Sequence, residues 1–244
     1  MKKLLKFEMY CLLRQISLYI CIIIAVLVVA VPIAIISSES VENVQSEANN
    51  LFNSAFSGSG IDLIIPILIS IIVTRDFSND SIRLIVGRGY SRIGIYCSKI
   101  ISSFIIICVM AIACWISAWI SIFMFMNIEI KIDFEMIKIM ISQIIVALAI
   151  GMVAITITFY TRKTSAAITA GILLPLTGTI GISLIESLIK IDYKLTDFWI
   201  WSCFAKLTGE TINVSTIYNA LFTSIIWIIL FFIIGFFKFN KSDI

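Results

Sequence analysis

The sequence predicts an all-α membrane protein with six transmembrane helices. Of its 244 residues, 60% are hydrophobic and only 14% are charged, and the mean hydropathy is +1.09. A soluble domain of this size cannot bury so many apolar side chains, so lipid is the expected solvent for most of them. The apolar residues also fall into runs of about 20, the length that a helix needs to cross the hydrocarbon core.

Six segments are apolar and long enough to cross. They are Ser17–Ile36, Ser57–Thr74, Ile100–Met126, Ile137–Tyr160, Ser165–Ile185 and Ile217–Phe237. The first follows a lysine-rich start, as in a signal peptide, but no small-residue cleavage site comes after it. We therefore expect it to be retained as a transmembrane helix, and we expect residues 1–244 to form one membrane domain.

The segment before the first span, residues 1–15, is predicted to form an amphipathic helix on the inner membrane surface. Its apolar residues recur at helical spacing, and its basic residues occupy other faces. The alternative is a frayed extension of the first span. The apolar set is Leu4, Leu5, Met9, Leu12 and Leu13, and the basic set is Lys2, Lys3, Lys6 and Arg14.

Three segments depart from the regular pattern of spans. The outer segment Ser37–Phe56 is expected to be a polar loop, and the fifth span is expected to be interrupted by glycines and a proline. Residues 186–210 carry too many charges for a seventh crossing. Their aromatic residues favour short helices that lie in, or dip back into, the outer interface and face lipid. The interrupting residues are Gly171, Pro175, Gly178 and Gly181, and the aromatic residues are Phe198, Trp199, Trp201 and Phe204.

The distribution of basic residues predicts the orientation of the chain. If the six predicted spans cross the membrane in alternating directions, most of the 18 Lys and Arg residues lie on the same side as the N-terminus. Most acidic residues then lie on the other side. Loops rich in Lys and Arg stay on the cytoplasmic side of a membrane. We therefore expect both termini to be cytoplasmic.

The most informative connection is residues 74–99, a long basic loop between the second and third spans. Side chains that can cap a helix precede Ser81–Val86, and Gly87 follows it, so a short exposed helix is predicted there. Ser91 is expected to cap the next helix. A short helix held between two membrane-anchored helices can transmit a push from a soluble motor. The alternative is an ordinary solvated hairpin whose arginines only fix the topology.

Residues for catalysis are scarce. The chain has no histidine, the commonest general base and metal ligand near neutral pH. It has no phosphate-binding loop of the form G-x-x-x-x-G-K-[ST]. Its six cysteines form no C-x-x-C pair and are interpreted as small apolar packing residues. We expect no catalytic residue, metal or cofactor on this chain, so the energy for any work must come from another polypeptide or an ion gradient.

Polar residues within the spans are candidates for a substrate pathway, because they are costly in lipid and often functional. The candidates are Asp62, Gln143, Thr156 and Thr177, with Thr158 and Thr179 beside them. Two alternatives stay open: Asp62 reaches the outer headgroups, and the threonines bond to their own helix backbone. An intramembrane enzyme is a further hypothesis, and it would need the carboxylate pair Asp62 and Glu186.

The basic loop also carries a resemblance to a known family. It contains Arg75-Asp76-Phe77-Ser78-Asn79-Asp80-Ser81-Ile82-Arg83-Leu84, followed by Ser91-Arg92 and Lys99. This resembles the pattern R-E-F-x-x-G-T-I-R-x-x-L, then S-R and a Lys, of the type-2 family of permease subunits of ATP-binding-cassette exporters. Asp76 and Ser81 are mild departures from that pattern, and Asp80 is a larger one. The C-terminus, Phe237–Ile244, resembles that family's basic ending followed by Asp-Ile or Asp-Leu.

The resemblance implies a transporter whose motor is a separate subunit. In such exporters the loop helix docks into a groove of the ATPase, which binds ATP and magnesium, and the N-terminal helix also touches it. A second permease subunit, identical or a sister chain, and membrane lipid are the other expected partners, and no nucleic acid is expected. The docking candidates carried over to this chain are Asp76, Asp80, Ser81, Ile82, Arg83, Leu84 and Arg88.

The resemblance also implies a location and a cargo. The expected location is the plasma membrane of a bacterial cell. Permeases of this size resemble those that export, or confer immunity to, antimicrobial peptides, so an amphipathic peptide is the expected cargo. The alternatives are a drug, a lipid or another hydrophobic substrate, or a membrane scaffold or sensor that transports nothing.

Overall fold

The computed structural model describes residues 2–37, 44–58, 60–78, 81–130, 132–189, 195–208 and 212–240. Within these residues the chain is mostly helical and has no strand, and six helical segments are long and apolar enough to cross a membrane. The prediction of an all-α membrane protein with six transmembrane helices is therefore confirmed. The helices are α1 (Lys2–Leu13), α2 (Ile16–Ile36), α3 (Val44–Ser57), α4 (Ile61–Ser78), α5 (Ser81–Gly87), α6 (Arg92–Met126), α7 (Phe134–Thr161), α8 (Thr164–Ile189), η1 (Leu195–Phe198), α9 (Ile200–Lys206) and α10 (Val214–Asn240).

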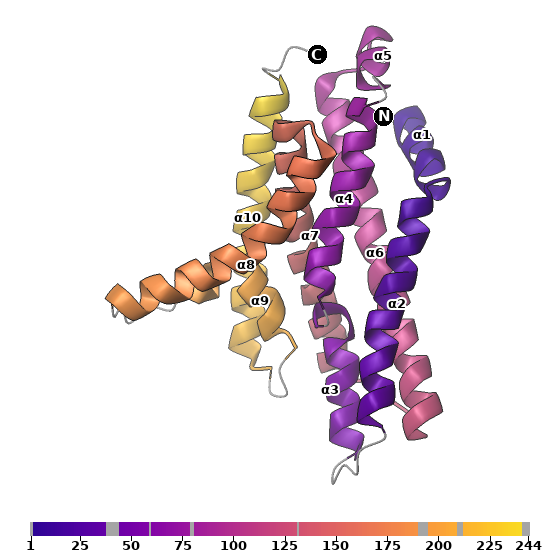
Figure 1. Ribbon diagram of the computed structural model, residues 1–244, viewed down its shortest axis with the longest axis vertical. Coiled ribbons are helices and arrows are strands. Elements are labelled where there is room, and N and C mark those ends of the chain that lie inside the picture. The colour runs from indigo at the N-terminus through magenta and orange to yellow at the C-terminus, as the bar shows by residue number, and fades with distance from the viewer. Residues whose placement is uncertain are drawn as a thin grey trace.

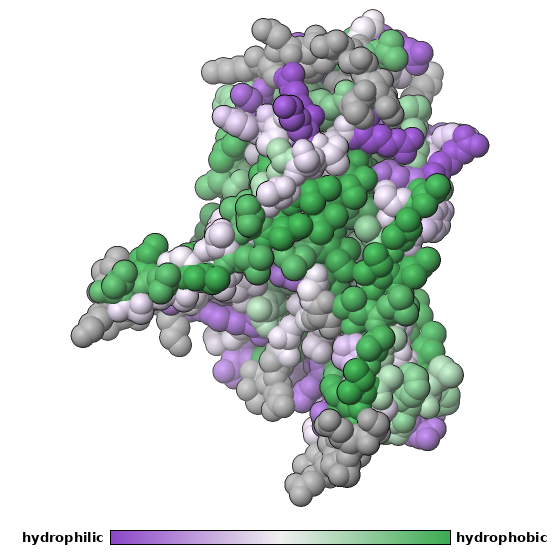
Figure 2. All heavy atoms as spheres, in the orientation of Figure 1, coloured by the Kyte–Doolittle hydropathy of each residue, from purple (hydrophilic) through white to green (hydrophobic). Residues whose placement is uncertain are grey.

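The long helices form an elongated bundle (Figure 1). α1, α5 and the C-terminal end of α10 lie at one end of this bundle, and α3 lies at the other. On the face shown in Figure 2, hydrophobic side chains cover much of the middle, and hydrophilic ones gather near the end that carries α5. This distribution fits a chain whose middle lies in lipid and whose ends meet water.

α7 is the centre of the bundle, where it contacts α3, α4, α6, α8, α9 and α10. Of its most apolar stretch, 72% of the residues are buried. Its buried residues include the small ones Ala147, Ala149, Gly151 and Ala154. Small side chains let helix backbones approach closely, and close packing is a main source of helix association in lipid.

The second span differs from its prediction, Ser57–Thr74, because two helices share it. α3 occupies much of the segment Ser37–Phe56, which was expected to be a polar loop, and α4 continues the span after a break near Gly58. The loop prediction is therefore wrong for residues 44–56, whereas residues 38–43 lie outside the described part of the chain.

α3 forms because its apolar residues recur at helical spacing among polar ones. Ala48, Phe52 and Phe56 are buried, and α3 packs against α6. Phe56 lies edge-on to Trp115 and to Phe204, and the ring centroids are 5.7 Å apart in both pairs. The buried stripe therefore outweighs the polar composition of the segment.

The fifth span was expected to be interrupted by glycines and Pro175; its helix is not broken, but it changes direction about halfway along (Figure 1). α8 is one continuous helix that contains Pro175. In lipid, neighbouring groups and local adjustments can satisfy the backbone groups that a proline frees. Only 11% of the apolar stretch of α8 is buried, and its second half projects away from the bundle (Figure 1).

The short helices predicted within residues 186–210 are present as η1 and α9. Their aromatic residues were expected to face lipid, but only Phe198 is strongly exposed, whereas Trp201 and Phe204 are buried. α9 turns these rings inward against α7 and α10. The segment therefore adds to the core, because burial between helices takes the place of a lipid interface.

The predicted N-terminal helix is present as α1. Gln15 has an extended backbone (φ −89°, ψ 112°) between α1 and α2, so α1 is a separate helix and not a frayed extension of the first span. Leu4 and Leu12 are buried on the side that packs against the rest of the protein, whereas Phe7 and Tyr10 are exposed. That α1 lies on the membrane surface remains a prediction.

A close approach of α10 to α6 gives a first testable prediction. A Cβ at Gly235 would lie 2.2 Å from the hydroxyl oxygen of Tyr96, a fully buried side chain. We expect Gly235→Ala to lower the free energy of unfolding by about 1–3 kcal/mol, because overpacking forces neighbours to shift. Thermal unfolding of the purified protein in detergent measures the change.

The matched control is Gly181→Ala, because a Cβ there meets no atom within 4 Å. It should leave stability unchanged or raise it, since alanine favours helix. Tyr96→Phe removes the clashing hydroxyl and should partly rescue Gly235→Ala. Equal melting temperatures for the two alanine variants would contradict the packing of α10 described above.

Candidate functional site

A buried ion cluster joins three helices at the α5 end of the bundle. The ammonium group of Lys99 in α6 lies 2.5 Å from Oε2 of Glu8 in α1 and also pairs with Oδ2 of Asp76 near the end of α4. The side chain of Lys99 is 2% exposed, that of Glu8 is 5% exposed and that of Asp76 is 21% exposed. We call Glu8, Asp76 and Lys99 the ion cluster. It ties α1 to the two helices that flank α5.

The charges of the ion cluster do not balance when all three groups are ionised, because two carboxylates face one ammonium. Burial raises the pKa of Glu8 above its ordinary value, although the nearby charge of Lys99 acts in the opposite direction. Oε1 of Glu8 is buried and has no hydrogen-bond partner among the described residues. A proton on Glu8 would therefore remove the surplus negative charge.

Sequence reasoning missed this cluster. It counted Asp76 as a docking residue and Lys99 as part of a motif, and it gave Glu8 no role. A signal was present, since Glu8 is the only acidic residue before Glu39 and lies within a basic amphipathic helix. Its partner is 91 residues away, so no local pattern could identify the pair.

α5 is the short helix that the basic loop was predicted to contain. It ends where Gly89 takes a left-handed backbone (φ 84°), and the N–H of Tyr90 donates to the carbonyl oxygen of Ile85 at 3.4 Å. The hydroxyl oxygen of Ser91 then accepts from the N–H of Gly94 at 3.2 Å, so the predicted cap of α6 is confirmed. Both of these features follow α5, whereas residues 79 and 80 before it lie outside the described part of the chain.

The predicted docking residues differ in their exposure to solvent. Leu84 is 64% exposed on α5 and Arg88 is exposed just after it, whereas Asp76 points to Lys99 within the ion cluster. Ser81, Ile82 and Arg83 lie in α5, but only their backbone is described, and Asp80 lies outside the described residues. Leu84 and Arg88 are therefore the described side chains that α5 offers to a partner.

An aromatic cluster lies behind the ion cluster and connects it to the core. Phe77 follows Asp76 directly, and its ring centroid is 5.2 Å from that of Phe159 in α7. Phe159 is also 5.2 Å from Tyr96, one turn before Lys99, and 4.8 Å from Phe239 in α10. Edge-to-face packing of this kind gives the contacts a defined geometry. A displacement of α4 or α6 at this end therefore meets rigid contacts with α7 and α10.

The pathway candidates do not form one site. Gln143 is fully buried, and its amide nitrogen lies 2.7 Å from the carbonyl oxygen of Asn53, 2.8 Å from Oγ of Ser57 and 3.2 Å from the carbonyl oxygen of Leu207. Thr156 lies almost four turns further along α7, about 20 Å away. Its hydroxyl group lies 2.9 Å from the carbonyl oxygen of Met152 and 3.0 Å from that of Phe231.

The remaining threonines bond to their own helices, which was the alternative left open. Thr177 donates to the carbonyl oxygen of Leu173 at 2.7 Å, and Thr158 and Thr179 make the equivalent bond four residues back. Asp62 lies in the first turn of α4 and is half-buried. Glu186 accepts from the N–H of Thr196 at 2.5 Å, and no described contact joins it to Asp62.

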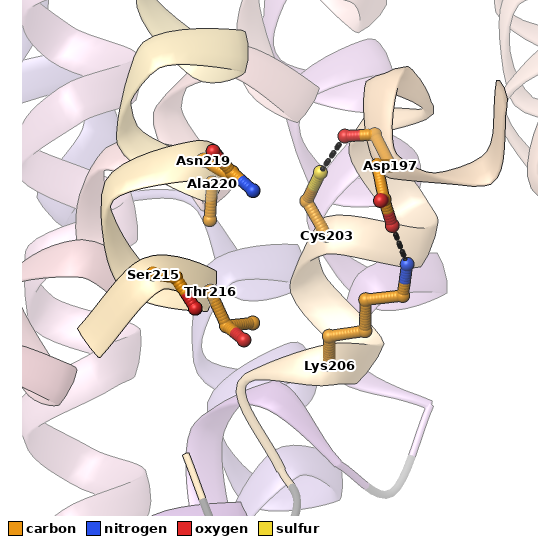
Figure 3. Close-up of a pocket in the computed structure, with 7 residues that line it drawn as sticks. All are labelled: Asp197, Cys203, Lys206, Ser215, Thr216, Asn219 and Ala220. Carbon is orange, nitrogen blue, oxygen red and sulfur yellow. Dashed lines mark hydrogen bonds and ion pairs between the residues drawn. The ribbon is translucent and has the colours of Figure 1, made fainter. Parts of the chain in front are cut away.

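A polar pocket of about 280 Å³ lies between α9 and the start of α10 (Figure 3). Its charged groups, Asp197 and Lys206, pair with each other, and the thiol of Cys203 donates to the carbonyl oxygen of Asp197 at 3.1 Å. Ser215, Thr216 and Asn219 line the opposite wall (Figure 3). Within the described part of the chain, no group of three or more His, Cys, Asp or Glu residues could hold a metal ion.

Comparison with known proteins gives one family. A sequence model described as "Protein of unknown function (DUF2705)" matches residues 19–244. The match includes Asp76 and Lys99 of the ion cluster but begins after Glu8. No curated protein matches the chain.

The ion cluster gives a second testable prediction. Lys99→Met removes the ammonium and leaves two carboxylates buried together, so we expect a loss of about 3–5 kcal/mol in the free energy of unfolding. We also expect α1 to detach from α6. Hydrogen exchange of the α1 amides in detergent measures the detachment, and thermal unfolding measures the loss.

Lys206→Met is the matched control, because Lys206 and Asp197 form a half-exposed ion pair. It should change stability by less than about 1 kcal/mol, since exposed pairs contribute little. Adding Glu8→Gln to Lys99→Met should recover part of the loss. If Lys99→Met and Lys206→Met were equally mild, the ion cluster would not be a buried structural link.

The pKa of Glu8 gives a third prediction. Because burial raises this pKa, the folded chain holds the proton more tightly than the unfolded chain does. The resulting stabilisation is complete below the ordinary pKa and is lost as the pH rises through the raised pKa. We expect the melting temperature to fall across that window and the dependence to flatten in Glu8→Gln. A wild-type melting temperature that rises with pH there would exclude this role.

Proposed function

The chain belongs to the DUF2705 family, and we propose that it is the membrane permease subunit of an ATP-binding-cassette exporter. In this proposal a separate ATPase subunit binds ATP and magnesium and docks on α5. A second permease subunit, identical or a sister chain, completes the export pathway. The cargo is an amphipathic peptide, and the protein lies in a bacterial plasma membrane with both termini in the cytoplasm.

The observation that carries the proposal is the attachment of α5 to two long helices that are linked to each other. α5 is a seven-residue helix between α4 and α6, and the residues that flank it, Asp76 and Lys99, pair with each other. A displacement of α5 would therefore move α4 and α6 together. The arrangement agrees with the loop pattern that resembles permease subunits of exporters.

The basic residues support the orientation. Arg75 and Arg88 are exposed at the α5 end, and Lys238 lies near the end of α10, with its ammonium 4.4 Å from the centre of the Tyr160 ring. Basic residues next to spans favour the cytoplasmic side. An ATPase in the cytoplasm would then meet α5 directly.

The aromatic cluster could transmit a movement of α4 and α6 to α7 and α10. Phe77 follows Asp76 in α4 and packs on Phe159 of α7, which packs in turn on Phe239 of α10. Packed interiors change between discrete arrangements and do not deform continuously. We infer that closure of the motor moves α4 and α6 and repacks α7 and α10 through these rings.

The exposed surface of α5 gives the fourth prediction. We expect Leu84→Asp and Arg83→Glu to weaken association with the ATPase by about 2 kcal/mol or more, roughly thirtyfold. The first adds a charge to the proposed contact, and the second reverses one. ATP hydrolysis coupled to the permease should be lost with the association. Co-purification with a co-expressed candidate ATPase subunit, followed by an ATPase assay, measures both.

Ile132→Asp is the control for Leu84→Asp. Ile132 is 55% exposed between α6 and α7, far from α5 in the fold, so the same kind of change should leave association intact. All variants should insert into the membrane normally. Retention of the ATPase by Leu84→Asp and Arg83→Glu, or equal loss in Ile132→Asp, would overturn the docking assignment.

A further inference from the structure

Two cavities adjoin at the end of the bundle opposite α5. The larger, about 480 Å³, lies between α3 and the start of α7. The smaller, about 260 Å³, lies between α7 and the start of α10. Glu135, Ile139 and Ile212 line both of them, so the two cavities share a wall. The larger volume is within the range of about 300–1,000 Å³ that is typical of ligand sites.

The larger cavity is rich in hydrogen-bond acceptors. α3 contributes Asn49, Asn50 and Asn53 to its lining, and the start of α7 contributes Glu135 and the preceding Asp133. Asp133 precedes α7, but its carboxylate makes no capping hydrogen bond, so the helix does not use it. Asp133 and Glu135 are exposed, whereas the side-chain oxygens of Asn49 and Asn53 are buried. Among the described residues that line this cavity, none is basic. Its acceptors and negative charge therefore favour a cationic group that carries several N–H donors.

The smaller cavity has the opposite character. Its wall is mostly aliphatic, with Ile141, Ile217 and Leu221 from the two helices, and Tyr218 closes one side. Lys138 also lines it, but its ammonium lies 4.7 Å from the centre of the Phe134 ring. Such a wall favours aliphatic side chains, because their transfer out of water is favourable.

We infer that the paired cavities bind one segment of a cationic amphipathic peptide. An ammonium or guanidinium group occupies the larger cavity, and neighbouring aliphatic side chains occupy the smaller one. The inference names the substrate class of the proposed exporter and rests on that proposal for its role in transport. Binding itself requires neither the ATPase nor nucleotide.

The charges favour a peptide over a lipid as the occupant. Phospholipid headgroups carry a phosphate, and many bacterial lipids are net anionic. Asp133 and Glu135 would repel a phosphate at the larger cavity, and none of the described residues that line it carries a positive charge to compensate. The same carboxylates would attract the side chain of a lysine or arginine.

The test uses the purified full chain in nanodiscs of neutral lipid, without the ATPase. A fluorescently labelled amphipathic peptide of lysine and leucine is titrated, and its anisotropy gives the dissociation constant. We expect Glu135→Gln to weaken binding about tenfold, because it removes a charge-assisted hydrogen bond. The affinity of this variant should also depend less on salt. Since Glu135 is exposed, the variant should fold normally.

Glu129→Gln is the matched control. Glu129 is exposed in the connection between α6 and α7 and lines neither cavity, so its loss should leave the affinity unchanged. A peptide with glutamine in place of lysine should bind weakly and should not distinguish wild type from Glu135→Gln. Tyr218→Ser, which reduces the apolar wall, should weaken the lysine peptide as well.

Three results would overturn the inference. They are no binding by the wild type, equal weakening by Glu129→Gln and Glu135→Gln, and displacement of the peptide by a phospholipid headgroup at the same site. Each is independent of the α5 test, because no motor subunit is present. Failure of the docking assignment would therefore leave peptide binding unaffected, and failure of peptide binding would leave docking unaffected.

Discussion

The buried ammonium of Lys99 is the interaction on which the α5 end of the protein depends. A charge removed from water is stable only when partners replace its hydration, and here Glu8 and Asp76 do so from two other helices. One side chain therefore fixes three backbones. α1 is too short to remain helical by itself. The ion cluster and the burial of Leu4 and Leu12 give it a defined position.

A second polar link, at Gln143, holds the opposite end. Its amide reaches Asn53 and Ser57 at the break between α3 and α4, and Leu207 after α9. A break in a spanning helix leaves backbone groups without partners, and these are costly in lipid. The side-chain amide of Gln143 donates hydrogen bonds to backbone carbonyl oxygens near this break. The ion cluster and Gln143 thus link helices at opposite ends of the bundle.

Hydropathy predicted the spans well because a fixed lipid thickness selects for a fixed helix length. Ser91 and α5 were also predictable, since caps and glycines act locally. The features that sequence reasoning missed depend on distant or hidden information. The stripe of Phe52 and Phe56 is concealed among polar residues, and the pairing of Glu8 with Lys99 joins positions 91 residues apart. The pathway threonines were ambiguous in principle, because a hydroxyl that bonds its own helix has the same sequence as one that faces a substrate.

The projecting half of α8 has a consequence for the surrounding bilayer. Trp199 donates to Thr179 at 3.2 Å, and Thr196 donates to Glu186, so the chain after α8 folds back along one side of that half. Its other side exposes Ile180, Leu184 and Leu188. Acyl chains must fill the angle between this arm and the bundle wherever no second protein does. Lipids in that angle could not keep their normal alignment, so we expect the stability of the protein to depend on the acyl-chain length of the host membrane.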